Sequence, residues 1–386
     1  MVYQSPKSQF RVREIGETKG LRQKEAGSFH LDEIQKKNKK KHRFFKLKYI
    51  LLVFFLALTA SGGYFLYQTN SAFDKMTGQE NSVLKSLIKM LPFSNNFFQI
   101  LPVEGGEISP VDKINNGELD RLNILLLGLR GVDDPNGGLL TDTMMIMSMK
   151  VDTGEVALIS IPRDLYVEIP YSEAKGKINE AYAYGMKNGD WQGGLDYSKN
   201  VTEEVTGLDI HYTVSVDFEA FKEIIDTLGG VTIYLDRPFS EMYQFEEGGI
   251  ALPAGENIID GDTALLFVRA RFSSNDFERA KRQQQVLVSV KNKALNLGIL
   301  SSPTKMISIL NSLGKHVRTD AELWEIQEMA KLVYKMSDSD IKRQVFDTTE
   351  AGLLYETYSS GGAYILLPDG DDYEAIHETC ADIFEK

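Results

Sequence analysis

The stretch Arg121–Leu129, RLNILLLGL, is an almost unbroken apolar run and predicts a buried β-strand. Two further apolar runs follow it, TMMIMSMK (143–150) and EVALISI (155–161). The turn sequence Asp152-Thr153-Gly154 separates these two runs, so we expect them to pair as a hairpin.

Helical and strand patterns alternate through the rest of the chain. Strands are expected at 230–235, 342–346 and 363–367. Helices are expected near 179–187, 195–206, 217–228, 261–271, 276–298, 303–314, 320–337 and 371–384. Because helices and direct hairpins are mixed in this way, the sequence predicts an α/β fold with a mixed central sheet flanked by helices.

Charge divides the 386 residues into two parts. Residues 1–48 hold 14 Lys/Arg and 5 Asp/Glu, whereas the remainder holds 29 and 50. The acidic main part argues against nucleic acid as a partner. The single cysteine, Cys380, excludes intramolecular disulfides, and the five histidines show no metal-ligand spacing.

An uncharged apolar segment follows the basic tail. Residues 49–67, YILLVFFLALTASGGYFLY, would span about 28 Å as a helix, close to the hydrocarbon core of a membrane. The lysine-rich run before it predicts a cytoplasmic N-terminus and an extracytoplasmic main part. We expect an uncleaved signal-anchor in the cytoplasmic membrane, the alternative being a cleaved signal peptide.

Residues 68–118 are expected to form an extracytoplasmic stalk. Apolar residues at helical spacing predict a short amphipathic helix at 83–91, ending before Pro92. This helix would either pack on the main domain or lie on the membrane surface. Beyond the stalk we expect a catalytic domain at 119–300 and a C-terminal extension, 301–386, packed on it.

The stretch RARFSSNDFERAKRQQQ (Arg269–Gln285) concentrates charge. A helix beginning near Asn275 would place Asp276, Arg279 and Gln283 on one face. Farther along, the same face is apolar and comprises Val286, Leu287, Val290, Ala294 and Leu297. Such a face suits a ligand with an anionic head and an apolar tail. The alternative interpretation is a set of surface arginines paired with nearby acids.

Other polar residues lie where predicted strands end. Asp142 stands just before the strand at 143–150. Pro162 ends the strand at 155–161, so that Arg163 and Asp164 enter a loop. Asn179 is expected to cap the next helix. Because open α/β sheets bind ligands at strand ends, these loops are expected to converge with Arg269–Gln285.

Several common catalytic signatures are missing from the sequence. It contains no G-x-x-x-x-G-K-[ST] loop, no G-x-S-x-G elbow and no G-x-G-x-x-G after a strand. The enzyme families recognised by these motifs therefore lose support.

Four motifs in order resemble the LytR–CpsA–Psr family. They are TDTMM (141–145), SIPRDL (160–165), KIN (177–179) and R-x-R-x4-D-x2-R-x2-RQQ (269–284). The resemblance covers roughly residues 121–298, and the single N-terminal anchor matches it as well. It implies an α/β domain with a polyprenyl pocket. The implied activity is Mg²⁺-assisted phosphotransfer of a glycopolymer from a polyprenyl-diphosphate carrier to a peptidoglycan hydroxyl.

The resemblance also implies roles for individual residues. The implied catalytic residues are Asp142, Asp276 and Arg279. Diphosphate binding is implied for Arg163, Lys177, Arg269, Arg271, Arg279, Arg282 and Gln283. Asp142 is implied as a metal ligand. Asp134, from the first loop of this chain, is our candidate for the second ligand.

The first loop departs from the family pattern. Many members have Gly-Ser-Asp-x-Arg after the first strand, whereas this chain has Gly128-Leu129-Arg130-Gly131-Val132. Leu140 also stands where many members have an arginine. Asp133 or Asp134 would replace the missing carboxylate, and Arg130 the missing cation.

Two other functions are compatible with the same residues. With water as the acceptor, the same site would make the protein a polyprenyl-diphosphate phosphohydrolase. A non-catalytic lipid-binding or regulatory protein of the cell envelope is the third possibility. Retention of the motif arginines and aspartates favours the transferase.

Overall fold

The computed structural model describes residues 108–132, 134, 138–169, 175–186, 190–245, 248–299, 302–333, 341–350 and 352–385. The predicted tail at 1–48, membrane span at 49–67 and helix at 83–91 all lie outside these residues. Among the described residues, no helix is both long and apolar enough to cross a membrane.

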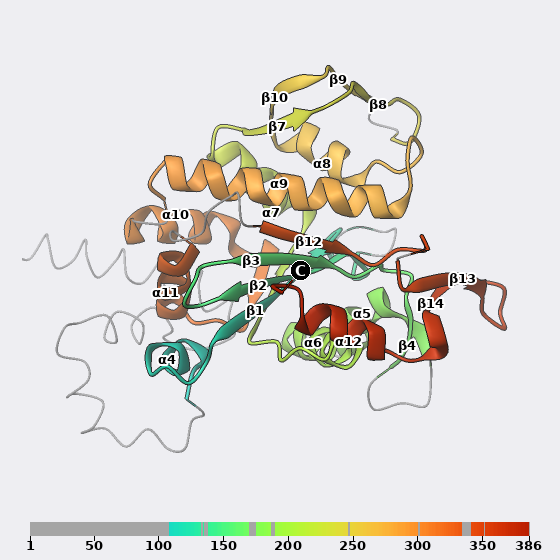
Figure 1. Cartoon of the computed structure of the whole chain (residues 1–386). Coiled ribbons are helices and arrows are strands. Elements are labelled where there is room, and N and C mark those ends of the chain that lie inside the picture. The colour runs from blue at the N-terminus through green and yellow to red at the C-terminus, as the bar shows by residue number, and fades with distance from the viewer. Residues whose placement is uncertain are drawn as a thin grey trace, which may run out of the picture. The chain divides into compact units, whose positions relative to one another are not determined.

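A six-stranded mixed sheet forms the centre of the described chain (Figure 1). Its strand order is β11 (Val317–Thr319), β6 (Tyr212–Val216), β1 (Arg121–Leu129), β2 (Thr141–Lys150), β3 (Val156–Ser160) and β12 (Ile341–Val345). The expected hairpin is confirmed, because β2 and β3 pair antiparallel. β1 pairs antiparallel with β2 but parallel with β6, and β12 pairs parallel with β3, which confirms the mixed sheet.

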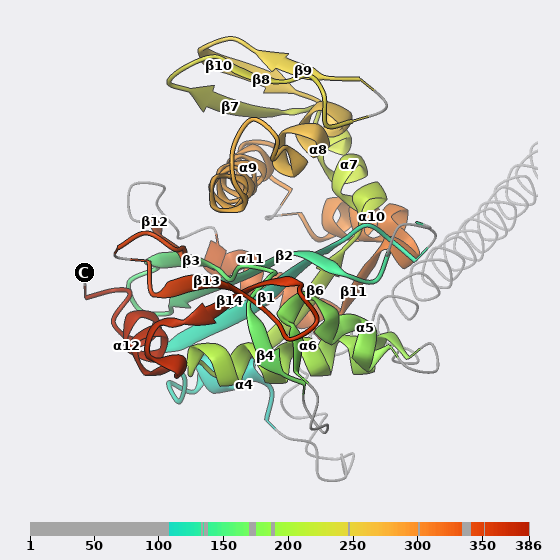
Figure 2. The same ribbon diagram turned by 90° about the vertical axis from the view of Figure 1, so that its right-hand side faces the viewer.

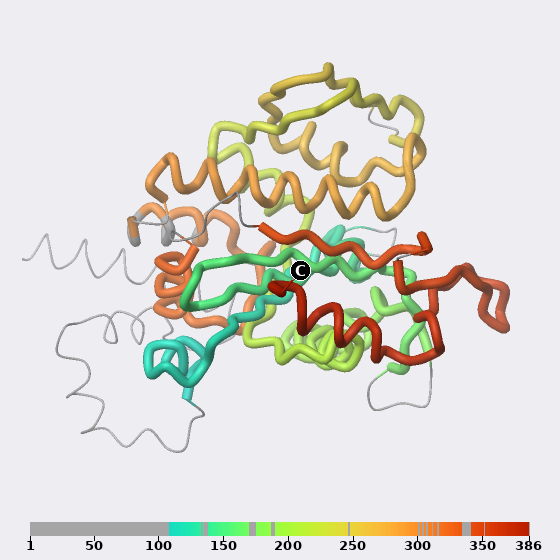
Figure 3. The backbone as a smooth tube through the Cα atoms, in the orientation of Figure 1, coloured from blue at the N-terminus to red at the C-terminus, as the bar shows by residue number. Residues whose placement is uncertain are grey.

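Both edge strands of this sheet come from the last quarter of the chain. β11 pairs antiparallel with β6 at one edge, and β12 borders β3 at the other. Figure 3 shows the C-terminal part of the chain running beside the early strands. Residues beyond 300 therefore complete the central sheet.

Helices cover both faces of the sheet (Figure 2). The described helices are α4 (Pro110–Asn115), α5 (Ala181–Gly185), α6 (Trp191–Thr206), α7 (Phe218–Thr227), α8 (Gly261–Arg269), α9 (Asp276–Asn296), α10 (Pro303–Leu313), α11 (Leu323–Val333) and α12 (Glu374–Ala381). The core alternates along β1: Leu125 and Leu127 pack with α6 and α12, whereas Leu122 and Ile124 pack with α4 and α11. This alternation follows from the two-residue period of a strand.

A third apolar cluster joins α7, α8 and α9 to a small β layer. The layer consists of β7 (Val231–Leu235) paired with β10 (Gly255–Ile259), and β8 (Phe239–Glu241) paired with β9 (Ile250–Leu252). Aspartate and asparagine side chains cap the three helices at their N-termini, as such residues commonly do: Asp217 on α7, Asp260 on α8 and Asn275 on α9. α9 thus begins at the predicted residue.

Two short hairpins lie near the end of β3. β4 (Tyr166–Glu168) pairs with β5 (Lys175–Lys177), and β13 (Leu354–Tyr358) pairs with β14 (Tyr364–Pro368). A bridge between Leu165 and Leu366 joins the two hairpins. The C-terminal hairpin is thereby attached to the loop that follows Pro162.

Two sequence expectations are wrong. Asn179 does not cap a helix, because it lies inside the 3-10 turn η1 (Ile178–Glu180) with its side chain buried. Leu297 does not continue the apolar face of α9, because it is the C-cap residue and is 42% exposed.

Candidate active site

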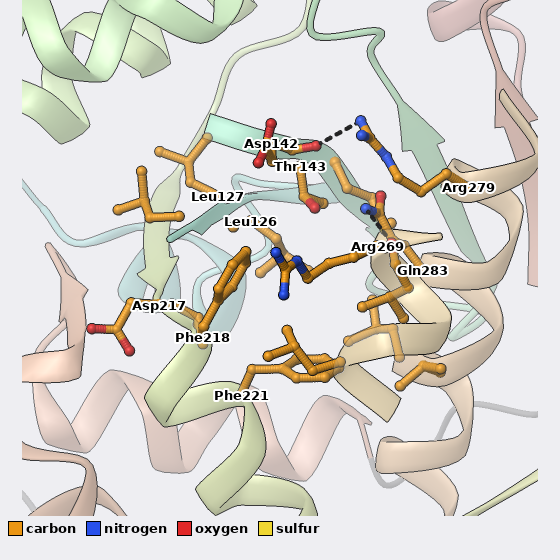
Figure 4. A pocket seen from close by; sticks show the side chains of 18 of the residues that line it. Leu126, Leu127, Asp142, Thr143, Asp217, Phe218, Phe221, Arg269, Arg279 and Gln283 are labelled. Carbon is orange, nitrogen blue, oxygen red and sulfur yellow. Dashed lines mark hydrogen bonds between the residues drawn. The ribbon is translucent and has the colours of Figure 1, made fainter. Parts of the chain in front are cut away.

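A cavity of about 250 Å³ lies between the sheet and helices α7, α8 and α9. Its apolar wall combines Leu126, Leu127, Phe218, Phe221, Ile224, Leu265, Val268, Val286, Leu287 and Val290. Charged and polar residues also line it, namely Arg130, Asp142, Arg163, Asp217, Gln244, Arg269, Arg271, Arg279 and Gln283. The predicted convergence of the strand-end loops with the Arg269–Gln285 segment is confirmed (Figure 4).

The position of Asp142 depends on a β-bulge. Gly128 pairs with Thr143 and Leu129 pairs with Thr141, so Asp142 is the extra residue between them. Such bulges redirect a side chain at the edge of a sheet. The close pairing also requires glycine, since a Cβ on residue 128 would lie 2.9 Å from the Thr143 Cβ.

Three arginines hold Asp142 in its charged form. Arg163 donates a hydrogen bond to one carboxylate oxygen, Arg130 Nε lies 3.4 Å from the other, and Arg279 donates to the backbone oxygen at 3.0 Å. Burial acts to raise the pKa of Asp142, but the nearby arginines outweigh it and hold that pKa below its usual value. Asp142 is therefore a carboxylate at neutral pH.

Arg163 lies among three aspartates. Besides its bond to Asp142, its Nε lies 3.6 Å from Asp164 Oδ2 and 3.7 Å from Asp276 Oδ1. Burial acts to lower the pKa of Arg163, but the three carboxylates raise it above its usual value. This guanidinium therefore joins the loop after β3 to the start of α9.

Arg279 connects Asp142 and Asp276 from the helix side. It is 5% exposed and donates to Asp276 Oδ2 at 2.9 Å. Burial lowers the pKa of Arg279, yet an arginine stays protonated at neutral pH. A buried cation is thus fixed at the polar end of the cavity.

Three buried polar atoms at this site have no hydrogen-bond partner within the described part of the chain. They are Arg163 Nε, Arg279 Nε and Asp276 Oδ1. Buried polar atoms are rarely left without a partner. Two donors and one acceptor of this kind, next to an apolar cavity, can serve an anionic head group and a hydroxyl.

Arg269 projects into the cavity beside the Phe218 ring (Figure 4). Its guanidinium carbon lies 4.6 Å from the centre of the Phe218 ring and 5.3 Å from that of Phe245. The side chain of Gln244 holds the adjoining turn, donating to Arg269 O and accepting from Phe272 N. No motif in the sequence pointed to Gln244, which acts through a long-range contact.

Arg282 does not line the cavity. Its guanidinium donates to the backbone oxygens of Phe267 and Ala270 and to Ser274 Oγ, and it packs on the Phe239 ring. Burial lowers its pKa to about 10, which leaves it protonated at neutral pH. In this structure Arg282 fixes the turn between α8 and α9.

Replacing Arg282 with alanine should therefore reduce stability. Because buried carbonyl acceptors would lose their donor, we expect the free energy of unfolding to fall by about 3 kcal/mol. Urea unfolding of the Arg282→Ala and Lys281→Ala proteins measures this. Lys281 is a neighbouring surface cation that pairs with Glu278. Equal stability of the two variants would contradict the role of Arg282 in fixing the turn between α8 and α9.

The two remaining predicted site residues lie beside the cavity. Lys177 Nζ contacts Asp164 Oδ1 at 2.5 Å and does not line the cavity. Asp134 lies 3.9 Å from Arg130 Nη1, and Arg130 in turn contacts Asp142. Arg130 thus supplies a cation in the altered first loop. It lies between Asp134 and Asp142 and contacts both.

The donor set suits a hard divalent cation bound together with phosphate. In the described ranges, no group of three His, Cys, Asp or Glu side chains could hold a metal. Mg²⁺ commonly uses only one or two carboxylates and completes its shell with phosphate oxygens and water. The ionised Asp142 at the cavity provides an oxygen donor of this kind.

Relatives of known name match most of the chain. The model of the LytR_cpsA_psr family matches residues 103–381. The polyisoprenyl-teichoic acid–peptidoglycan teichoic acid transferase TagU of Oceanobacillus iheyensis is 36% identical over 299 residues, covering 76% of this chain and 82% of that protein. The protein of the same name from Bacillus subtilis is 26% identical over 280 residues, covering 72% of this chain and 79% of that protein.

Solved structures share the fold. The crystal structure of B. subtilis TagV has a TM-score of 0.54 at 22% identity, covering 69% of this chain and 98% of that one. Protein gbs0355 from Streptococcus agalactiae has a TM-score of 0.57 at 20% identity, covering 72% of this chain and 92% of that one. The resemblance found in the sequence motifs is confirmed by the match over residues 103–381, and the chain belongs to the LytR_cpsA_psr family.

Proposed function

We propose that this protein is a membrane-anchored phosphotransferase that moves a glycopolymer from a polyprenyl-diphosphate carrier to a hydroxyl group of peptidoglycan. The cavity carries this proposal, because it joins an apolar wall to a cluster of arginines, of which Arg279 is buried. The relatives named teichoic acid transferase support both the class of polymer and the acceptor. We further propose that residues 49–67 anchor the protein, with the catalytic domain outside the cytoplasmic membrane.

The head group of the carrier would bind at the polar end. Arginine forks match phosphate oxygens geometrically and keep their charge at any relevant pH. Arg163 and Arg279 each have a buried Nε without a hydrogen-bond partner in the described chain, and Arg269 and Arg271 also line the cavity. The prenyl chain would lie against Val286, Leu287 and Val290 of α9, as the charged-then-apolar face of this helix requires.

The reaction is a displacement at the phosphorus that carries the glycan. The acceptor oxygen forms a bond to this phosphorus while the phosphorus–oxygen bond to the prenyl phosphate breaks. Polyprenyl monophosphate leaves, and the hydroxyl proton passes to a base. Asp276 Oδ1 is suited to that hydroxyl because the other carboxylate oxygen already accepts from Arg279 at 2.9 Å.

The protein residues mainly position the reactants and neutralise charge, which is what phosphoryl transfer requires. When bound at Asp142, with Asp134 as a further donor, Mg²⁺ would supply additional charge neutralisation on the diphosphate. Arg163 fixes Asp142 and Asp276 relative to each other through its contacts with both.

Product analysis tests the proposal. Purified protein is supplied with a polyprenyl-diphosphate-linked glycan in H₂¹⁸O, with and without peptidoglycan. We expect polyprenyl monophosphate to form in proportion to glycan attached to peptidoglycan, with no ¹⁸O in the new phosphate linkage. Release at the same rate without peptidoglycan, with ¹⁸O in the product, would instead establish a phosphohydrolase. A lipid-binding protein would release nothing.

A further inference from the structure

The C-terminal hairpin β13–β14 lies beside the proposed catalytic residues. Leu366 N donates to Asp164 O at 2.9 Å, and Leu366 bridges Leu165. β14 accordingly contacts β4, next to which it lies in Figures 1 and 2. None of the motifs that indicated the active site includes this hairpin.

Two tyrosines of the hairpin contact each other, and one of them, Tyr364, lies near Lys177. Tyr358 is 71% exposed, and its ring meets the Tyr364 ring edge-to-face with 6.3 Å between centroids. Lys177 Nζ lies 6.0 Å from the centre of the Tyr364 ring and 2.5 Å from Asp164 Oδ1. Burial, together with the charges of Glu356, Asp164 and Asp276, raises the pKa of Tyr364 to about 12, which agrees with its place beside these carboxylates.

In-line displacement determines the side from which the acceptor must approach. The attacking and leaving oxygens lie roughly in line through the phosphorus. If the prenyl phosphate leaves toward the large cavity, the acceptor must enter from the opposite side of Arg163 and Arg279. A second, small cavity borders the same cluster, and its lining includes Asp142, Arg163, Arg279, Asp276, Phe277 and Val345.

We propose that Tyr358 and Tyr364 bind the sugar rings of the acceptor glycan strand and guide its hydroxyl to Asp276. This inference rests on the proposed function and names the surface that its acceptor would occupy.

The chemistry of this surface fits a saccharide. The C–H faces of a sugar ring pack against aromatic rings, while its hydroxyls need polar partners at the ring edge. Tyrosine offers both a flat apolar face and a hydroxyl. Lys177 and Glu356 flank Tyr364 and supply a donor and an acceptor, and Thr348 Oγ1 lies 3.4 Å from Glu356 Oε1. A prenyl chain would gain nothing from these polar groups.

Binding without a lipid donor tests the inference. Soluble, uncrosslinked peptidoglycan glycan strands are titrated into wild-type, Tyr358→Ala and Tyr358→Trp proteins by calorimetry. Because one aromatic contact is lost, we expect Tyr358→Ala to weaken binding by about tenfold, and Tyr358→Trp to retain it. In the transfer assay, the same alanine variant should raise the KM for the strands and leave the KM for the lipid donor unchanged.

Tyr234→Ala is the matched control, since Tyr234 is 65% exposed and lies on β7 in the separate small β layer. Its affinity should equal that of wild type, and all three variants should keep the wild-type melting temperature. Equal affinity of Tyr358→Ala and wild type, or no binding of strands by wild type, would overturn the inference. Failure of the transferase proposal would appear separately, as absence of transfer from the lipid donor.

Discussion

The Arg279→Ala protein is expected to lose transfer by about 10²–10³-fold while the cavity wall stays intact, because one buried donor to the developing charge is removed. Arg279 is 5% exposed and contacts both Asp276 and the backbone of Asp142. Its loss therefore also removes the hydrogen bonds that connect the start of α9 to β2. Initial rates with saturating acceptor measure the effect.

Two variants separate chemistry from folding in this experiment. Arg279→Lys keeps the charge but loses the planar fork, so it should recover only part of the rate. Lys281→Ala, two residues away on α9, removes a surface cation paired with Glu278 and should retain full activity. Near-normal transfer by Arg279→Ala, with an unchanged melting temperature, would remove this arginine from the mechanism.

Asp276→Asn should lower kcat by about 10²–10⁴-fold and leave affinity for the lipid diphosphate nearly unchanged. Asparagine has the same size and still offers an oxygen to Arg279, but it cannot take up the proton of the acceptor hydroxyl. Single-turnover rates together with donor binding, measured on the same protein, distinguish the two effects.

Glu278→Gln provides the control for Asp276→Asn. Glu278 belongs to the same first turn of α9 but is 46% exposed and pairs with Lys281. We expect wild-type kcat from this variant. If Asp276→Asn instead weakened donor binding with kcat unchanged, Asp276 would be a head-group contact rather than the base.

Local patterns were sufficient to predict much of the central sheet. The apolar run of β1, the turn between β2 and β3, and the cap at Asn275 all act within a few residues. The strand β6 was not predicted, although Thr213, Val214 and Val216 are β-branched residues typical of strands. The edge strand β11 is three residues long, which is too short for an alternation of apolar and polar residues to indicate a strand.

The site was predicted in composition but only partly in arrangement. Asp142, Arg163, Arg269 and Arg279 converge as expected, because they follow strand ends or lie on one helix face. Arg282 instead donates hydrogen bonds to backbone oxygens at the end of α8. This contact depends on how α8 and α9 pack, which the sequence pattern does not show. The bulge at Asp142 likewise depends on pairing between strands and has no signature within the first loop.

The altered first loop illustrates the same limit. The sequence showed that a carboxylate and two basic groups were missing from their usual places, and it offered Asp133 or Asp134 and Arg130 as replacements without showing what they contact. In the structure Arg130 contacts Asp142 and lies 3.9 Å from Asp134, so the loop retains a cation at the cavity. Metal binding at Asp142 remains a proposal that titration of Mg²⁺ with the lipid diphosphate present can test.

The most direct measurement is a crystal structure of the protein with a polyprenyl diphosphate. We expect phosphate oxygens within hydrogen-bond distance of Arg163 Nε and Arg279 Nε, two buried donors that make no hydrogen bond in the described chain. The prenyl chain should lie along Val286 and Val290, and Asp276 should face the phosphorus from the opposite side. A prenyl chain bound outside the α7–α8–α9 cavity, or a diphosphate that contacts neither arginine, would contradict the central claim.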